Sequence, residues 1–200
     1  MAGSGAHGAP LPSRLRCLRM RRLPILLALV ALAGCGGDEE IAGGAGDLPG
    51  PVPAGVRFAE APKGALRAPV FTAELLDGTP VASGDLWRDR PLLLVFTASY
   101  CNRCAAIHRA AAETVSAQDG AVGLLGIVGE DDVDGGREYA EKLDLGQPIA
   151  VASERTWLDY AAREPGLVVL VSKGGKVLRG WPGGATAEQL LPALEEVVTR

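Results

Sequence analysis

The sequence predicts an α/β domain over residues 67–200. Two runs, 92–97 and 122–128, are largely apolar, which is typical of strands covered on both faces. Each run is followed by a segment with the apolar spacing of a helix. The chain then predicts a β-hairpin and a final amphipathic helix. Strands and helices therefore alternate along a stretch of ordinary domain length.

The elements up to the first long helix are predicted in this order. Residues 69–76 and 79–82 form a short hairpin joined by Asp77-Gly78, a pair that favours tight turns. Residues 85–87 form a brief helical turn before the strand at 92–97. Residues 102–118 are predicted to form a helix, in which one face is shared by Ile107, Ala111, Thr114 or Val115, and Gln118.

The second half of the domain continues the alternation. Helices are predicted at 136–143 and 155–162, and strands at 167–171 and 177–181, whose connection contains Gly174-Gly175. The final helix buries Leu190, Leu191, Leu194, Val197 and Val198. Its start is open. Thr186 and Gln189 have the spacing of a capping box, which puts Pro192 inside the helix, whereas a start near Leu191 puts Pro192 in the first turn.

The motif Cys101-Asn102-Arg103-Cys104 lies where the strand 92–97 meets the helix 102–118. Two cysteines separated by two residues can close into a small disulfide and reopen. The positive end of the helix dipole favours a thiolate there, and thiolate is the attacking species in disulfide exchange. The motif in this position predicts reversible redox chemistry.

Residues 1–34 have the pattern of a secretory signal. Five arginines precede an apolar stretch from Leu23 to Ala33, and small residues follow. The start at Met20 gives a more compact leader than Met1. Leu32-Ala33-Gly34-Cys35 resembles the lipobox of bacterial lipoproteins, which implies a lipid on Cys35 and a domain held at a membrane outside the cytoplasm. The alternatives are an uncleaved anchor and plain secretion. Eleven apolar residues are too few to span a membrane.

Residues 35–66 are predicted to be a flexible tether. Twelve of the 31 residues after Cys35 in this segment are Gly or Pro, and no apolar periodicity is visible. The chain beyond Cys35 contains 24 acidic and 15 basic residues, a net charge of −9. This charge argues against nucleic acid as a partner and against attachment to a membrane through basic residues.

The predicted order of elements and the placement of the cysteines resemble the thioredoxin-like domains of the TlpA/ResA kind, which are tethered bacterial thiol–disulfide oxidoreductases. The matching segments are Ala68 to Phe71, Asp77 to Val81, Phe96 to Cys104, Glu164 to Val171 and Gly174 to Val177. The resemblance implies a three-layer α/β/α sandwich with a mixed central sheet and a short N-terminal β-hairpin.

The resemblance also implies roles for individual residues. Cys101 is expected to attack substrates, Cys104 to resolve the mixed disulfide, and Pro165 to lie beside the sulfurs after a cis peptide bond. No cofactor is expected beyond the redox-active disulfide Cys101–Cys104. The implied partners are secreted proteins with disulfides or dithiols, apocytochrome c among them, and a membrane electron-transfer protein.

Several positions depart from the family pattern. Tyr100 replaces the usual tryptophan before the first cysteine, and Arg103 occupies a position that is often proline. A guanidinium there can stabilise the Cys101 thiolate and lower its pKa, whereas Glu164 can oppose this effect. Val95 and Ile107 stand where related proteins carry buried polar or acidic groups, so no internal base for Cys104 is evident.

Two patterns leave alternative readings open. His108 can share one helix face with Cys101 and Cys104, so a Cys/Cys/His site for Cu(I) or Zn(II), an acid–base role and ordinary packing remain alternatives. Residues 130–141 follow the spacing of a calcium loop, with Glu130 in place of the first aspartate. The incoming segment is a strand, however, and acidic residues there can simply cap the next helix.

Three functions are compatible with the motif: a thiol–disulfide oxidoreductase, a thiol peroxidase of the redoxin relatives, and a metal-delivery module. The peroxidase signature requires Pro and Thr seven and three residues before the attacking cysteine. Here these positions are Leu94 and Ala98, which disfavours that alternative.

Overall fold

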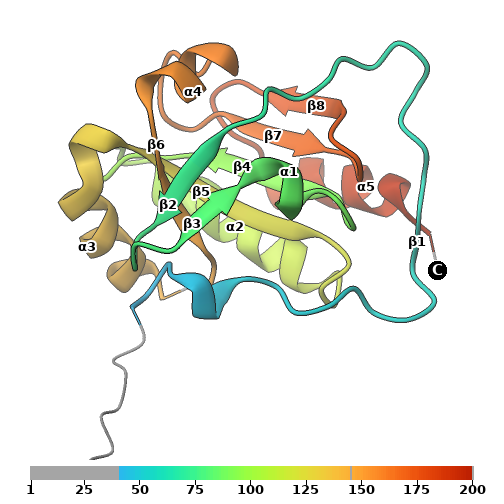
Figure 1. Ribbon diagram of the computed structural model, residues 1–200, viewed down its shortest axis with the longest axis horizontal. Coiled ribbons are helices and arrows are strands. Elements are labelled where there is room, and N and C mark those ends of the chain that lie inside the picture. Colours follow the sequence, from blue (N-terminus) through green and yellow to red (C-terminus); the bar gives the residue numbers. More distant parts are fainter. Residues whose placement is uncertain (1–40, 145, 200) are drawn as a thin grey trace, which may run out of the picture. The chain divides into compact units, whose positions relative to one another are not determined.

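A seven-stranded mixed sheet lies between two layers of helices in the computed structural model, which describes residues 41–144 and 146–199 (Figure 1). The elements in chain order are η1 (Ala45–Asp47), β1 (Arg57–Phe58), β2 (Thr72–Leu75), β3 (Pro80–Ala82), α1 (Ser83–Leu86), β4 (Leu92–Phe96), α2 (Cys104–Ser116), β5 (Gly123–Gly129), η2 (Glu130–Asp132), α3 (Val133–Leu143), β6 (Ile149–Ala152), α4 (Glu154–Asp159), β7 (Val168–Val171), β8 (Val177–Trp181), α5 (Ala187–Val197) and β9 (Val198–Thr199).

The strand order in the large sheet is β3-β2-β6-β5-β4-β7-β8. The three central strands β6, β5 and β4 run parallel, and the remaining neighbours pair antiparallel. The fully buried strand β4 is therefore flanked by β5 on one side and β7 on the other. Because β4 and β5 are parallel neighbours, their carboxyl ends lie side by side at the same end of the sheet.

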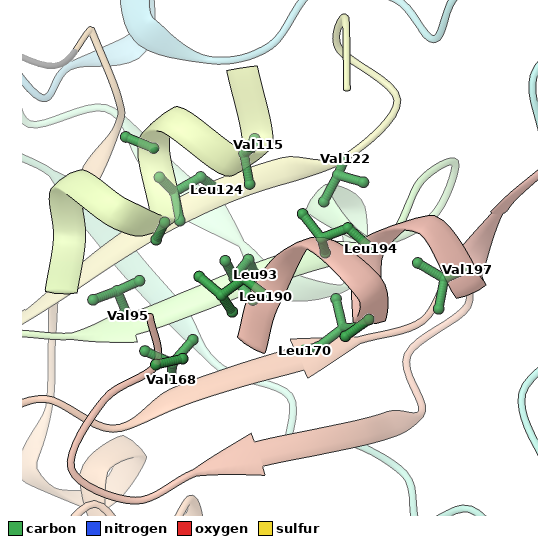
Figure 2. Packing of buried hydrophobic residues seen from close by; sticks show 14 of the residues in the cluster. Leu93, Val95, Val115, Val122, Leu124, Val168, Leu170, Leu190, Leu194 and Val197 are labelled. Atoms are coloured by element: carbon green, nitrogen blue, oxygen red, sulfur yellow. The ribbon is translucent and has the colours of Figure 1, made fainter. Parts of the chain in front are cut away.

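The side chains of β4 alternate between the two faces of the sheet, as the period of a strand requires. Leu93 and Val95 belong to a core with α2 and α5, to which Val115, Leu190 and Leu194 contribute (Figure 2). Leu92, Leu94 and Phe96 belong to the core on the opposite face.

The second face of the sheet is covered by aromatic side chains from short segments. Phe71 contacts the rings of Trp87 and Tyr160 edge-on, at 6.4 and 6.1 Å between centroids. Trp157 of α4 packs edge-on against Phe96 at 5.2 Å. The expected α/β class and three-layer sandwich, with a mixed sheet and a β2–β3 hairpin, are confirmed.

Several elements differ from the prediction. Strand β6, with the sequence Ile-Ala-Val-Ala, was not predicted, because it has only four residues and its two β-branched residues are each followed by alanine. Strands β1 and β9 were not predicted either, and Val198, expected inside the final helix, belongs to β9. Leu191, expected to be buried, is 40% exposed.

Of the two starts left open for the final helix, the structure has the earlier one. Helix α5 begins at Ala187, and the backbone N–H of Thr186 donates to Gln189 Oε1 at 3.0 Å, so the capping box forms. Pro192 lies inside this helix. It has no backbone N–H to donate to the carbonyl of Glu188, but Glu188 is exposed, so water can bind that carbonyl instead.

The described part of the expected tether, residues 41–66, packs against the domain. Strand β1 pairs with β9, and Val56 and Phe58 contact the core beside α5. The buried guanidinium of Arg90 donates to the carbonyls of Gly50 and Gly120. These contacts use backbone groups and isolated apolar side chains, so they leave no periodicity in the sequence. Residues 35–40 lie outside the described residues.

None of the helices in residues 41–144 and 146–199 is both long enough and apolar enough to cross a membrane.

Candidate active site

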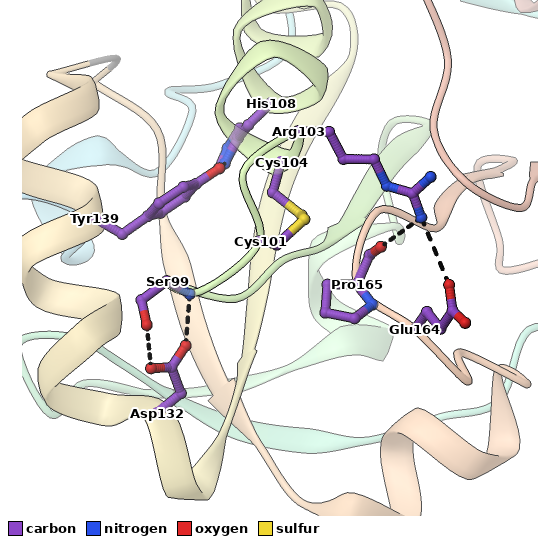
Figure 3. Close-up of a disulfide and its surroundings, with 9 residues drawn as sticks. All are labelled: Ser99, Cys101, Arg103, Cys104, His108, Asp132, Tyr139, Glu164 and Pro165. Atoms are coloured by element: carbon purple, nitrogen blue, oxygen red, sulfur yellow. Dashed lines mark hydrogen bonds and ion pairs between the residues drawn. A yellow bond between two sulfur atoms is a disulfide. The ribbon is translucent and has the colours of Figure 1, made fainter.

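The two cysteines of the motif form a disulfide at the carboxyl end of β4 (Figure 3). The sulfur atoms are 2.11 Å apart and the Cα atoms 5.4 Å. Helix α2 begins at Cys104, so Cys101 lies in the turn before the helix. The first backbone N–H groups of a helix have no partner within it and point out of its N-terminal end. Such an end of a helix favours negative charge on a nearby sulfur.

The two sulfur-bearing residues differ in exposure. Cys104 is fully buried, whereas Cys101 is half-buried and follows Tyr100, whose side chain is 73% exposed. Only Cys101 is therefore open to an incoming macromolecule. This asymmetry fits the two roles expected from the sequence, an attacking and a resolving cysteine.

Arg103 connects the cysteine motif to the loop that contains Pro165. Its Nη2 donates to the Pro165 carbonyl oxygen over 3.4 Å and lies 3.7 Å from Glu164 Oε2. The loop then joins the sheet, because Gly166 N–H donates to the Phe96 carbonyl at 2.6 Å. Pro165 thus lies beside the motif, as expected. The cis geometry of its peptide bond stays a prediction.

The opposite side of the motif is held by Asp132 at the end of η2. Its carboxylate accepts hydrogen bonds from the backbone N–H of Ser99 at 2.7 Å and from Ser99 Oγ at 2.6 Å (Figure 3). Sequence reasoning missed this pair. Ser99 follows β4 and Asp132 follows β5. Because the carboxyl ends of neighbouring parallel strands lie side by side, the sequence could have indicated that these two residues meet.

Comparison with known proteins gives structural matches only. No protein-family model matches the chain, and no curated protein matches its sequence. The thioredoxin domain of a thiol–disulfide oxidoreductase from Bacteroides vulgatus has a TM-score of 0.60 at 17% identity, over 66% of this chain and 95% of that one. A thiol:disulfide interchange protein from Chlorobium tepidum has 0.57 at 15%, over 68% and 97%. A secreted disulfide oxidoreductase from Mycobacterium tuberculosis has 0.52 at 21%, over 62% and 93%. The chain has the thioredoxin fold.

Val95 and Ile107, which stand where related proteins carry a buried polar or acidic group, both lie in the apolar core. Val95 is fully buried and Ile107 is 9% exposed, and both pack beneath α5. No aspartate or glutamate is buried among the described residues. His108 is the buried side chain on α2 that carries a basic nitrogen.

His108 lies one turn after Cys104 and is 1% exposed. Its Nδ1 is 3.4 Å from the hydroxyl of Tyr139, and its Nε2 has no partner among the described residues. Burial lowers the pKa of His108 to about 4 and raises the pKa of Tyr139 to about 12. The imidazole is therefore neutral at neutral pH.

The metal alternatives have little geometric support. In the part of the chain that the structure describes, no group of three or more His, Cys, Asp or Glu side chains is arranged to hold a metal ion. In segment 130–141, whose spacing follows a calcium loop, both carboxylate oxygens of Asp132 accept hydrogen bonds from Ser99. Cys35, the expected lipid attachment site, lies outside the described residues.

Proposed function

We propose that this protein is an extracytoplasmic thiol–disulfide oxidoreductase tethered to a bacterial membrane by a lipid on Cys35. The observation that carries the reaction type is the Cys101–Cys104 disulfide at the start of α2, with one accessible and one buried cysteine. The names of the structural neighbours describe proteins of the same reaction type. The leader, with its apolar stretch and Cys35, supports export and tethering.

In the reducing direction, the Cys101 thiolate attacks one sulfur of a substrate disulfide. The substrate S–S bond breaks, a Cys101–substrate disulfide forms, and the departing substrate thiolate takes up a proton. Cys104 then loses its proton and attacks the Cys101 sulfur, which releases the second substrate thiol. Counting the proton that Cys101 releases when it ionises, the protein gives up two electrons and two protons, and the substrate gains them.

The surroundings of the disulfide support a protein substrate. Pro165 lies beside the motif and is expected to leave room for an extended substrate segment to pair with the neighbouring backbone. The substrates we propose are secreted proteins with disulfides or dithiols, apocytochrome c among them. A membrane electron-transfer protein would return the two electrons to Cys101–Cys104, because an oxidising compartment does not supply them.

The mechanism is tested by trapping the mixed disulfide. Cys104→Ala should accumulate a disulfide-linked substrate through Cys101, whereas the wild-type protein should release it within one catalytic cycle. Non-reducing electrophoresis followed by mass spectrometry detects the adduct. The matched control is the double variant Cys101→Ala/Cys104→Ala, which should trap nothing. Equal trapping by the control and the single variant would refute the assigned roles.

The tether is tested separately. Cys35→Ser should move the protein from the membrane fraction to the soluble extracytoplasmic fraction and abolish labelling with a radioactive fatty acid. Its rate of disulfide exchange with a soluble substrate should be unchanged. Retention of Cys35→Ser in the membrane fraction would overturn lipid anchoring and leave the redox proposal intact.

A further inference from the structure

An open groove of about 680 Å³ is lined by residues from the segment after β4, from η2 and from α4. We call it the acidic groove and define it by six of its lining residues, namely Tyr100, Glu130, Asp131, Glu154, Trp157 and Leu158. Tyr100 directly precedes Cys101. A chain bound in the groove therefore lies within reach of the accessible sulfur.

The charge of the groove is mostly negative. Its lining contains the carboxylates of Glu130, Asp131, Asp132 and Glu154 and a single cation, Arg163. Asp132 is engaged by Ser99. The exposed side chains of Glu130, Asp131 and Glu154 form no ion pair with any residue in the described ranges. These three carboxylates are available to a positively charged partner.

The groove is also partly apolar. Tyr100 and Leu158 are 73% and 65% exposed, and both line it. Trp157 also lines the groove, and its ring packs edge-on against the buried Phe96 at 5.2 Å between centroids. A large exposed aromatic and an exposed leucine beside a rigid indole offer a contact surface for an apolar side chain.

We infer that the acidic groove binds a positively charged polypeptide segment of the substrate, in which lysine or arginine residues and an apolar side chain flank the reacting cysteine. The carboxylates attract the cations and speed association, while Tyr100, Trp157 and Leu158 cover the apolar side chain. This inference rests on the proposed function and specifies its substrate class. According to this inference, carboxylates outside the cysteine motif determine which substrates react fastest.

The test uses the reduced full chain and two disulfide-linked peptide dimers, one with Lys-Lys and the other with Glu-Glu before Cys-Leu. In each reaction the protein dithiol becomes the Cys101–Cys104 disulfide, and one peptide disulfide becomes two peptide thiols. Stopped-flow measurement of peptide thiol release gives the rate constants. The linear disulfide of 2-mercaptoethanol is a small uncharged substrate that does not need the groove.

The lysine peptide should react roughly tenfold faster than the glutamate peptide at low ionic strength, and the preference should fall as salt is added. The triple variant Glu130→Gln/Asp131→Asn/Glu154→Gln should remove most of the preference, with its rate toward the disulfide of 2-mercaptoethanol unchanged. The matched control neutralises three other exposed carboxylates, Glu60→Gln/Glu195→Gln/Glu196→Gln, and should keep the preference. Both variants change the net charge of the protein equally.

Equal rates for the two peptides would overturn the inference, and so would a preference that survives the triple variant. A preference lost equally in both variants would also overturn it, because it would then reflect net charge alone. In each of these outcomes reaction with the disulfide of 2-mercaptoethanol persists. Failure of the reduced protein to react with any disulfide would instead overturn the proposed function itself.

Discussion

The Arg103 guanidinium lies 3.7 Å from the Glu164 carboxylate while also donating to the Pro165 carbonyl. The cation inside the cysteine motif is thus partly neutralised by the loop that faces the disulfide. Both side chains are more than half exposed, so solvent screens the pair strongly. Their effect on the cysteines is therefore expected to be small and of opposite sign.

The first prediction concerns the reduction potential of the Cys101–Cys104 pair. Arg103→Ala removes a positive charge that stabilises the thiolate, so the potential should fall by about 10–20 mV. Glu164→Gln removes the opposing charge and should raise it by a similar amount. Equilibration with glutathione measures both. Arg88→Ala, which removes an exposed arginine paired with Asp85, is the control and should leave the potential unchanged. Shifts of Arg103→Ala and Glu164→Gln in the same direction would contradict this account.

The second prediction concerns the bond between Ser99 and Asp132. Asp132→Ala removes two hydrogen bonds from Ser99 to an ionised carboxylate; because Ser99 is exposed and water can replace the acceptor, the free energy of unfolding should fall by about 1–2 kcal/mol. Ser99→Ala keeps the backbone bond and should cost about 1 kcal/mol. Urea denaturation measures both. The neighbouring exposed Asp131→Ala should change stability by no more than about 0.5 kcal/mol. A loss for Asp131→Ala equal to that for Asp132→Ala would contradict a specific role for this bond.

The central part of the fold could be predicted because its signals are local. Strand β4 is an unbroken apolar run, and α2 repeats apolar residues at helical spacing, so each segment indicates its own secondary structure. The disulfide followed from the same local reading, since the strand-to-helix junction lies at Cys101. Strand β6 could not be found in this way, because a four-residue segment is too short to show a clear period, and its pairing with β5 and β2 is visible only in the folded sheet.

The surroundings of the disulfide depend on long-range contacts. Ser99 and Asp132 are 33 residues apart, and Arg103 and Pro165 are 62 residues apart. These residues meet only after the strands before them have paired. The same holds for residues 41–66, where Gly43 accepts a hydrogen bond from Ile149 N–H at 2.9 Å. The Gly and Pro content, from which a flexible tether was predicted, carries no information about such contacts with distant segments.

The third prediction concerns Gly126, which lies in β5 under His108. A Cβ atom at this position would be 2.8 Å from His108 Cε1 and 3.0 Å from Ile149 Cγ1. Gly126→Ala should therefore lower the free energy of unfolding by about 1–3 kcal/mol. Gly180→Ala is the matched control on β8, where the nearest atom is 4.0 Å away, and it should be nearly neutral.

The double variant Gly126→Ala/His108→Ala tests the cause of this cost. Removal of the imidazole frees space for the new methyl group, so the two substitutions should destabilise less together than the sum of their separate effects. Thermal and urea denaturation provide the four values of the cycle. Simple additivity would show that the cost of Gly126→Ala arises elsewhere.

The fourth prediction concerns the pH dependence of stability. Burial holds the pKa of His108 at about 4 in the folded protein, below the ordinary 6.5 expected in the unfolded chain. Below pH 6.5 the unfolded chain therefore binds a proton that the folded protein excludes, and stability falls until the folded histidine is also protonated near pH 4. The full loss in the free energy of unfolding amounts to about 3 kcal/mol. Above pH 7 the histidine is neutral in both states, so it causes no loss of stability there.

Comparison of the wild-type protein with His108→Leu isolates this loss, because all other titrating groups are common to both proteins. Urea denaturation at a series of pH values from 7 to 4 should show the wild-type protein losing about 3 kcal/mol more than the variant. The variant itself can be less stable at every pH, so the decisive quantity is the change of the difference with pH. A constant difference would mean that the imidazole is solvated or paired in the folded state, contrary to its burial and to the unpartnered Nε2.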